Sequence, residues 1–142
     1  MASTEYTAEI ELTATRVADA DRLRVLPQYC GARYMIATEN AVYNWMSCLV
    51  TGYEVGLWDF YEVSNGTFFM VPCGEKNYNV EFAPNYYSGQ MSAEAVGITA
   101  TLYALNQMAN HTAQHHIIEL YYALREFAKA HFESAEIMRA ID

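Results

Sequence analysis

The feature that most constrains this chain is the dipeptide Asn65-Gly66, which lies between two runs rich in aromatic residues. Asn tolerates positive φ and Gly adopts it freely, so the pair predicts a two-residue type I′ turn between antiparallel strands. Before the turn, one strand face would carry Trp58, Phe60 and Glu62 and the other Leu57, Asp59, Tyr61 and Val63, whereas residues 67–71 are almost wholly apolar. We therefore expect a β-hairpin whose first strand has an acidic edge and whose second strand is buried on both faces.

Periodicity places the other elements along the chain. Alternating residues predict a short edge strand near residues 10–14 and a third strand at residues 78–82. Apolar residues at threes and fours predict helices over residues 19–26, 32–51, 93–109 and 134–141, and a further helix capped by Thr112. We expect Pro27 to end the first helix, Ser92 to cap the third, and Asn110 to break it. The predicted fold class is α+β: a small antiparallel sheet (the hairpin plus a third strand) packed with several α-helices.

Composition indicates one domain with enough apolar material for a core. The chain has 142 residues, 53% of them hydrophobic and 20 aromatic, and a chain of this size buries roughly two thirds of its unfolded surface. We expect a single domain over residues 1–142, with residues 1–8 flexible. The cysteines Cys30, Cys48 and Cys73 form no C-x-x-C pair and lie in or beside apolar runs, which predicts reduced, mostly buried thiols.

Charge and hydropathy exclude several classes of protein. Seventeen acids against eight bases give a net charge of −9, so we expect no direct nucleic-acid binding, which needs clustered Lys and Arg. The N-terminus lacks the basic and then apolar segments of a signal peptide. The longest apolar helical candidate carries Glu39, Asn40 and Asn44, too many polar groups for a membrane span. These features predict a cytoplasmic protein, which either is simply soluble or faces a basic protein surface.

Catalytic and metal-binding patterns are weak. His111 and His115 have the i, i+4 spacing of a two-histidine metal site and His116 follows, but the expected helix boundary at Asn110 and Thr112 would separate them. Asp59 and Glu62 are three apart on a strand and should face opposite sides, which disfavours a two-carboxylate hydrolase site. We expect no metal and no cofactor.

The acidic residues show a clearer pattern. Residues 54–81 contain five acids and one base, a net charge of −4. One interpretation is a solvated face; the other is a binding patch for a basic protein, in particular one that handles DNA. Tyrosine is favoured in interfaces, so nearby tyrosines could anchor such a partner or could belong to the core. The candidate partner-binding residues are Tyr53, Glu54, Asp59, Tyr61, Glu62 and Glu81.

Several blocks of sequence follow one another in a distinctive order and spacing. They are Val42-Tyr43-x-Trp45-Met46, Tyr53-x-x-Gly56-x-Trp58-Asp59-Phe60-Tyr61, Ser64-Asn65-Gly66-x-Phe68-x-Met70-x-Pro72, the run of residues 91–106, and Ala140-Ile141-Asp142. Together they resemble a known family, the ArdB/KlcA antirestriction proteins of plasmids and other mobile elements. The likeness covers about residues 20–142, with Thr67 and Phe69 departing from the family pattern where a second Gly and a Tyr are expected.

The resemblance implies a non-enzymatic inhibitor of DNA cleavage by bacterial type I restriction systems, with a small antiparallel sheet packed with helices. A protein that imitates DNA needs about one charge per 1.7 Å of duplex axis, and a net charge of −9 on an aromatic-rich domain falls well short of that density. We therefore expect protein-directed or indirect action that leaves methylation largely intact. The expected partner is a type I restriction enzyme or a host DNA-processing protein. The alternative is a small hydrolase that uses His111, His115 and His116 or the strand carboxylates.

Overall fold

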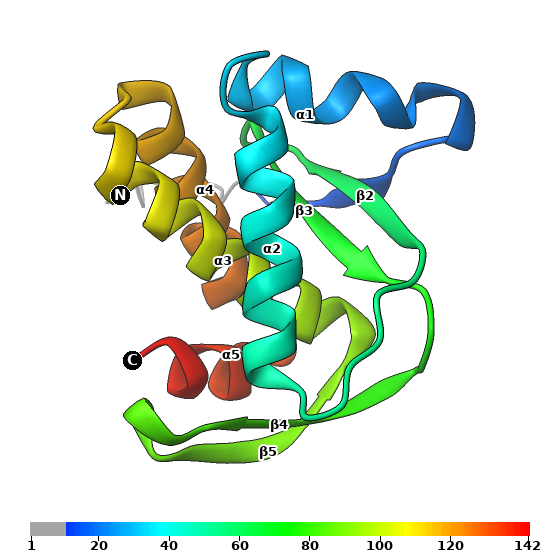
Figure 1. Cartoon of the computed structure of the whole chain (residues 1–142), viewed down its shortest axis with the longest axis vertical. Coiled ribbons are helices and arrows are strands. Elements are labelled where there is room, and N and C mark those ends of the chain that lie inside the picture. The colour runs from blue at the N-terminus through cyan, green and yellow to red at the C-terminus, as the bar shows by residue number, and fades with distance from the viewer. Residues whose placement is uncertain (1–10) are drawn as a thin grey trace, which may run out of the picture.

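The computed structural model describes residues 11–142, so the predicted flexibility of residues 1–8 lies outside the described part. Within these residues, five α-helices pack together against two separate small antiparallel sheets, which lie at the outside of the helix group (Figure 1). The α+β class predicted from the sequence is confirmed. In chain order the elements are β1 (Ala14–Arg16), α1 (Arg22–Cys30), α2 (Met35–Leu49), β2 (Trp58–Val63), β3 (Thr67–Pro72), β4 (Asn77–Phe82), β5 (Tyr87–Ser92), α3 (Ala93–Thr112), α4 (His115–Ala130) and α5 (Ser134–Ile141), with short 3₁₀ turns at Asp19–Asp21 and Ala83–Asn85.

The predicted hairpin is β2 and β3, but its turn differs from the prediction. Val63 pairs with Thr67, so three residues form the loop, and the Gly66 N–H donates to the Val63 carbonyl at 3.0 Å. Gly66 has a φ of +91° whereas Asn65 does not have a positive φ, so the type I′ turn is wrong. The geometry is that of a three-residue loop with glycine in the left-handed position. As expected, every residue of β3 is buried.

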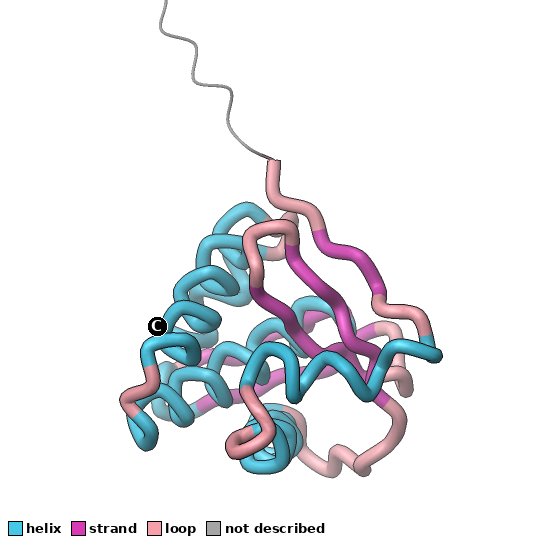
Figure 2. Tube along the Cα trace, turned by 90° about the horizontal axis from the view of Figure 1, so that it is seen from above, coloured by secondary structure: helices cyan, strands magenta, loops and turns pink. Residues whose placement is uncertain are grey.

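The third strand of this sheet is β1, not residues 78–82. β1 pairs with β2, whereas β4 pairs with β5 in a second sheet. Figure 2 shows the three strands side by side, with helices gathered along the β3 side. The sequence analysis missed β5 because its outward residues Ser88 and Gln90 flank Gly89 in a polar run, although its inward residues Tyr87 and Met91 are buried.

Helix α3 lies unusually close to the edge of β3. A Cβ atom on Gly97 would lie 2.1 Å from the Met70 carbonyl oxygen, so only glycine permits this approach. One turn further along, the Thr101 hydroxyl accepts a hydrogen bond from the Met70 N–H at 3.2 Å and donates to the Gly97 carbonyl at 2.8 Å. Helix α3 therefore covers β3 and satisfies part of its exposed backbone. Ser92 caps this helix as predicted, accepting from the Ala95 N–H at 3.1 Å.

Three predicted helix boundaries are wrong. Thr112 does not cap the next helix: it is the last residue of α3, and α4 begins at His115 after the N-cap residue Gln114. α1 continues through Pro27 to Cys30. The carbonyl freed by the missing proline N–H belongs to Leu23, which is 93% exposed, so water can satisfy it. α3 likewise continues past Asn110 to Thr112 and stops only where Ala113 takes a left-handed φ of +52°. The last helix has the predicted bounds.

The cysteines and the membrane prediction can also be compared with the structure. All three cysteines are free, as predicted, but Cys48 and Cys73 are exposed, which corrects the expectation of mostly buried thiols. Burial raises the pKa of the Cys30 thiol to about 11. Among the described residues no helix is both long and apolar enough to cross a membrane.

Candidate functional site

Two of the predicted partner-binding acids, Asp59 and Glu62 on β2, are held by arginines of the same chain. Asp59 Oδ1 lies 2.9 Å from Arg16 Nη2 on β1, and this hydrogen bond lowers the pKa of the Asp59 carboxyl. Glu62 accepts two 3.0 Å hydrogen bonds from Arg24 on α1, which lower its pKa, as does a 2.6 Å hydrogen bond from the Tyr29 hydroxyl. The charges of both carboxylates are therefore used to join β1 and α1 to β2.

The two predicted tyrosine anchors are packed into the fold. The Tyr53 hydroxyl accepts from the Trp58 indole N–H at 2.7 Å, and the Tyr53 ring meets the Trp58 ring edge-on. Tyr61 stacks on Phe69 with ring centroids 5.2 Å apart. Burial raises the pKa of both tyrosines. Each ring thus has a structural role, and each stays half-buried at the surface.

Glu54 and Glu81 are arranged differently from the β2 acids. Both are exposed, and among residues 11–142 neither takes part in an ion pair within 4.0 Å. Glu54 lies in the loop between α2 and β2, and Glu81 lies on β4. Because β4 belongs to the second sheet, the expectation that Glu81 lies on the strand next to β2 is wrong. The structure therefore separates the predicted acids into two groups, neutralised acids on β2 and free acids elsewhere.

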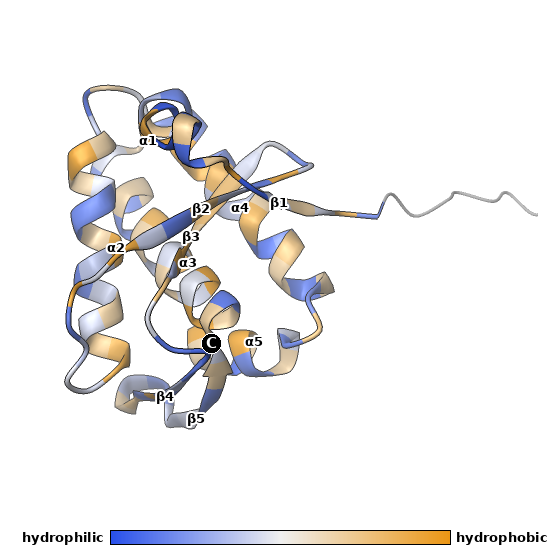
Figure 3. Ribbon diagram, turned by 90° about the vertical axis from the view of Figure 1, so that its right-hand side faces the viewer, coloured by the Kyte–Doolittle hydropathy of each residue, from blue (hydrophilic) through white to orange (hydrophobic). Residues whose placement is uncertain are grey.

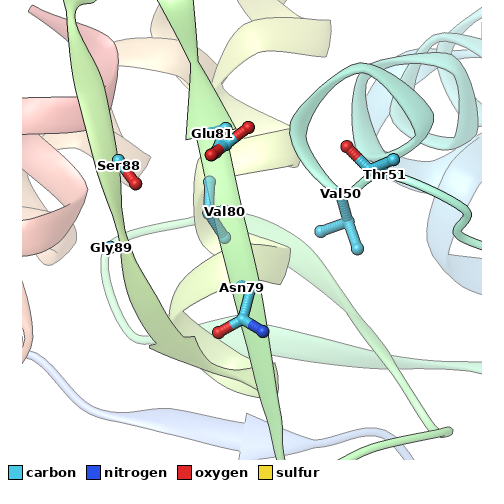
Figure 4. A pocket seen from close by; sticks show the side chains of 7 residues that line it. All are labelled: Val50, Thr51, Asn79, Val80, Glu81, Ser88 and Gly89. Carbon is cyan, nitrogen blue, oxygen red and sulfur yellow. The ribbon is translucent and has the colours of Figure 1, made fainter.

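A groove of about 640 Å³ opens beside Glu81. Figure 4 shows Val50 and Thr51, at the end of α2, on the side of β4 that faces away from β5. Glu81 is the only charged residue that lines the groove among the described residues, so the groove favours a cationic group. Figure 3 shows a mixture of hydrophilic and hydrophobic colours along the β4–β5 hairpin. The lining residues are Val50, Thr51, Asn79, Val80, Glu81, Ser88 and Gly89.

The tip of the same hairpin presents Tyr86, which is not among the candidate residues selected from the sequence. Its side chain is 95% exposed and its φ is +53°, a left-handed conformation that Tyr rarely adopts. The preceding Asn85 fixes the tip, because its side-chain amide donates to the Tyr103 hydroxyl at 3.1 Å and to the Ala140 carbonyl at 2.8 Å. An exposed ring on a fixed backbone is suited to protein contact. The Pro84-Asn85 turn was the signal in the sequence.

The three candidate histidines do not form a site. His111 ends α3, while His115 and His116 begin α4 beyond the left-handed Ala113. His115 Nε2 pairs with Glu119 at 2.6 Å and His116 Nε2 lies 3.1 Å from the Cys30 carbonyl oxygen. Within residues 11–142, no three His, Cys, Asp or Glu side chains are grouped closely enough to hold a metal ion.

A fourth histidine, His131, is buried in a polar cluster that the sequence analysis missed. Its Nδ1 accepts from the Glu133 backbone N–H at 3.0 Å, so Nε2 carries the proton and donates to Glu94 at 3.2 Å. The Glu133 carboxylate in turn accepts from the Ser92 hydroxyl and backbone N–H. Ser92 bonds to Glu133 rather than to the imidazole, whose two nitrogens are both occupied. The cluster therefore fastens the α4–α5 junction to the start of α3 and offers no free base.

Similarity to known proteins shows what the geometry alone does not. A family model described as "Antirestriction protein" matches residues 51–142. The chain belongs to the antirestriction protein family. It is 44% identical to an antirestriction protein KlcA of Escherichia coli over 92% of this chain and 94% of that protein. A second KlcA from the same species is 40% identical over 96% of this chain and 99% of that protein.

A solved structure extends the family relationship to the fold. It matches with a TM-score of 0.87 and 42% identity, covering 96% of this chain and 99% of the other. That structure is described as showing, for the KlcA and ArdB proteins, a novel fold and antirestriction activity against type I DNA restriction systems in vivo but not in vitro. The family model covers β2 to α5, and the residues it matches include the Tyr86 tip, the His131 cluster and every residue that lines the groove except Val50.

Proposed function

We propose that this chain protects incoming DNA by inhibiting cleavage by type I restriction systems, and that it acts without catalysis. The similarity to KlcA and ArdB proteins along nearly the whole chain is the observation that carries this proposal. The catalytic alternative has less support, since the candidate histidines are dispersed and the two β2 carboxylates, Asp59 and Glu62, are bound by arginines. A hydrolase needs a free base near a nucleophile.

The mode of action proposed is protein-directed or indirect. Activity in vivo but not in vitro, described for the solved relatives, fits an inhibitor that needs a host component missing from the purified reaction. The charge arrangement also argues against imitation of DNA. Asp59 and Glu62 are neutralised by Arg16 and Arg24, so still fewer carboxylates remain free to match the phosphate spacing of a duplex. The free acids Glu54 and Glu81 are the better candidates for contact with a type I enzyme or a host DNA-processing protein.

The direct test is made in cells that carry a type I system. Cells expressing the chain should receive unmodified phage DNA far more efficiently than cells with the empty vector, while methylation of the same sites continues. Equal restriction in the two strains would refute the function. Purified type I enzyme should cleave DNA at the same rate with or without the chain, and a direct block there would refute the indirect mode.

Variants separate the competing interpretations within this assay. Replacing His111, His115 and His116 together by Gln should leave protection intact, whereas the hydrolase alternative requires its loss. Reversing Asp59 or Glu62 to Lys would break internal ion pairs and confuse stability with binding. The cleaner reversal is Glu54→Lys with Glu81→Lys, which removes no ion pair and should weaken protection if these acids contact the partner.

A further inference from the structure

The backbone of β4 has an edge that the rest of the described chain leaves open. The Ala93 N–H donates to the Lys76 carbonyl at 2.9 Å, so Lys76 and Ala93 form a hydrogen-bonded pair in register with the β4–β5 ladder. Bonding alternates along an antiparallel pair, and therefore the N–H and C=O groups of Asn79 and Glu81 point away from β5. Within residues 11–142, no hydrogen bond from outside the hairpin reaches these groups.

The β1 and β3 edges are covered or interrupted, and the β4 edge differs from the β5 edge because it faces the end of α2 across the groove. Thr101 satisfies the Met70 N–H on the outer edge of β3. β1 has only three residues and carries Arg16, which is paired with two aspartates. On the outer edge of β5, the Glu133 carboxylate accepts from the Ser92 N–H at 2.9 Å, whereas in the described part of the chain Ser88 and Gln90 have open backbone groups but no helix end opposite them in the groove. Folded proteins protect edge strands because an open edge pairs with other chains, so a six-residue edge left open beside a groove is suited to a partner.

We infer that an extended segment of a partner protein adds to the outer edge of β4 as a further antiparallel or parallel strand, with a Lys or Arg side chain facing Glu81. Backbone bonds to Asn79 and Glu81 supply affinity in this binding mode, and pockets for alternate side chains supply specificity. The groove between β4 and the end of α2 receives the segment (Figure 4). The inference rests on the proposed function for the biological role of that partner.

Charge and side-chain alternation define the chemistry of the segment. The groove contains one carboxylate, Glu81, and no base, on a chain with a net charge of −9. Alternate residues of an added strand face opposite sides. One set would lie along Asn79 and Glu81 on the exposed face, and the other would face Val50, which is 9% exposed. A segment that alternates basic and aliphatic residues therefore fits both sides.

Binding can be measured with a defined probe, a short fluorescent peptide that alternates Lys and Val. Fluorescence anisotropy should detect its binding to the whole chain, and hydrogen exchange at the Asn79 and Glu81 amides should slow when it is bound. A peptide that alternates Glu and Val, and a Lys–Val peptide N-methylated along one edge, should each bind about tenfold more weakly. Equal binding of all three peptides, or no protection of these amides, would overturn the inference.

A proline pair provides a matched test of the edge. Asn79 and Gln90 are direct register partners, and the N–H of each points outward, one at each edge of the hairpin. Asn79→Pro should lower peptide affinity about tenfold, because it removes one ladder donor, whereas Gln90→Pro should leave affinity unchanged. Equal losses in the two variants would contradict binding at the β4 edge.

A second variant pair keeps the sheet intact in case proline disturbs it. Thr51→Trp should fill the groove from the turn that follows α2, while Ser47→Trp lies four residues earlier, on α2, at another exposed position that does not line the groove. Loss of peptide binding and of protection in cells with Thr51→Trp alone supports the inference, and retention of both refutes it. Failure of the unaltered chain to protect cells would refute the proposed function separately, because peptide binding is measured without the restriction system.

Discussion

The outer strands of the two sheets differ in whether another element covers their edges. In the sheet of β1, β2 and β3, helix α3 closes against the outer strand through Gly97 and Thr101. In the hairpin of β4 and β5, the outer strand borders a groove of about 640 Å³, and the tip carries an exposed tyrosine. The first arrangement stabilises the core, and the second leaves backbone groups free. The difference supports the proposal that the β4–β5 hairpin binds a partner.

The left-handed turn positions of the two hairpins show the same contrast. Gly66 holds φ +91° in the β2–β3 loop, where glycine adopts positive φ without strain. Tyr86 holds φ +53° in the β4–β5 loop, where a bulky residue is strained. Strain of this kind is found most often at functional sites. The β2–β3 turn is therefore unstrained, whereas the β4–β5 turn is strained and carries an exposed side chain.

The largest effect is expected from adding a side chain at Gly97, where α3 contacts β3. Gly97→Ala places a Cβ atom 2.1 Å from the Met70 carbonyl oxygen, which forces α3 away from β3. We expect a loss of about 3 kcal/mol in the free energy of unfolding, measured by urea denaturation. Gly56→Ala is the control, since its Cβ would meet nothing within 4 Å. Similar stability of the two variants would contradict the tight contact between α3 and β3.

A smaller loss is expected when the Met70 N–H loses its acceptor. Thr101→Val keeps the shape of the side chain but leaves this buried donor unpaired, which should cost about 2 kcal/mol. Thr99→Val is the matched control on the same helix. Its hydroxyl donates only to the Ala95 carbonyl and the Met91 sulfur, so its loss should stay below about 1 kcal/mol. Equal losses in urea denaturation would mean that the sealed edge of β3 does not depend on Thr101.

Substitution of the glycine in the β2–β3 turn should also destabilise the protein. Gly66→Val puts a β-branched residue at a φ of +91° and should lower the free energy of unfolding by more than about 1 kcal/mol. The thermal midpoint should fall accordingly. An unchanged midpoint would show that the loop can change conformation without cost, and that Gly66 is not held in the left-handed position.

The corresponding position in the other hairpin should respond in the opposite direction. Tyr86→Gly relieves a left-handed strain of about 1 kcal/mol, and the greater freedom of glycine in the unfolded chain offsets part of the gain. We expect the protein to become more stable by about 0.5 kcal/mol and to protect cells less well. Ala113→Gly, at φ +52° between α3 and α4, should stabilise without changing protection.

The smallest effect concerns the pH dependence of the surface ion pairs. The pKa of Glu62 is lowered from its ordinary value of 4.5, so its interaction with Arg24 stabilises the fold above about pH 4.5 and is lost as the pH falls through the folded-state pKa. Glu62→Gln should therefore flatten the acid side of a plot of thermal midpoint against pH. Glu81→Gln removes no ion pair and serves as the control. Identical pH profiles of Glu62→Gln and the unaltered chain would contradict a stabilising interaction between Glu62 and Arg24.

The sequence predicted the local elements better than their assembly. Alternation and helical periodicity identified β2, β3, β4 and most helices, since these patterns arise from local geometry. The helix ends predicted at Pro27 and Asn110 were wrong because tertiary packing and exposure override a local preference. The separation of β4 from the first sheet was not predictable, because any alternating segment suits either sheet.

The candidate surface was predicted in part. The sequence identified the acids but not their partners, and it could not show that Arg16 and Arg24, more than thirty residues away, neutralise Asp59 and Glu62 while Glu81 stays free. The predicted contact residues remain a proposal, now concentrated on Glu54 and Glu81. The His131 cluster was not predicted from the sequence because the partners of His131, Glu94 and Glu133, lie in different parts of the chain.

The sequence by itself determined the family, the α+β class and the aromatic hairpin, because those follow from residue order and short-range periodicity. Tertiary structure alone decided which strand edge is closed and which is open. That decision depends on groups distant in the chain, such as Gly97 against Met70, meeting within a few ångströms. Backbone hydrogen bonds between strands have no sequence signature of their own, so only the folded arrangement shows where they are left unmade.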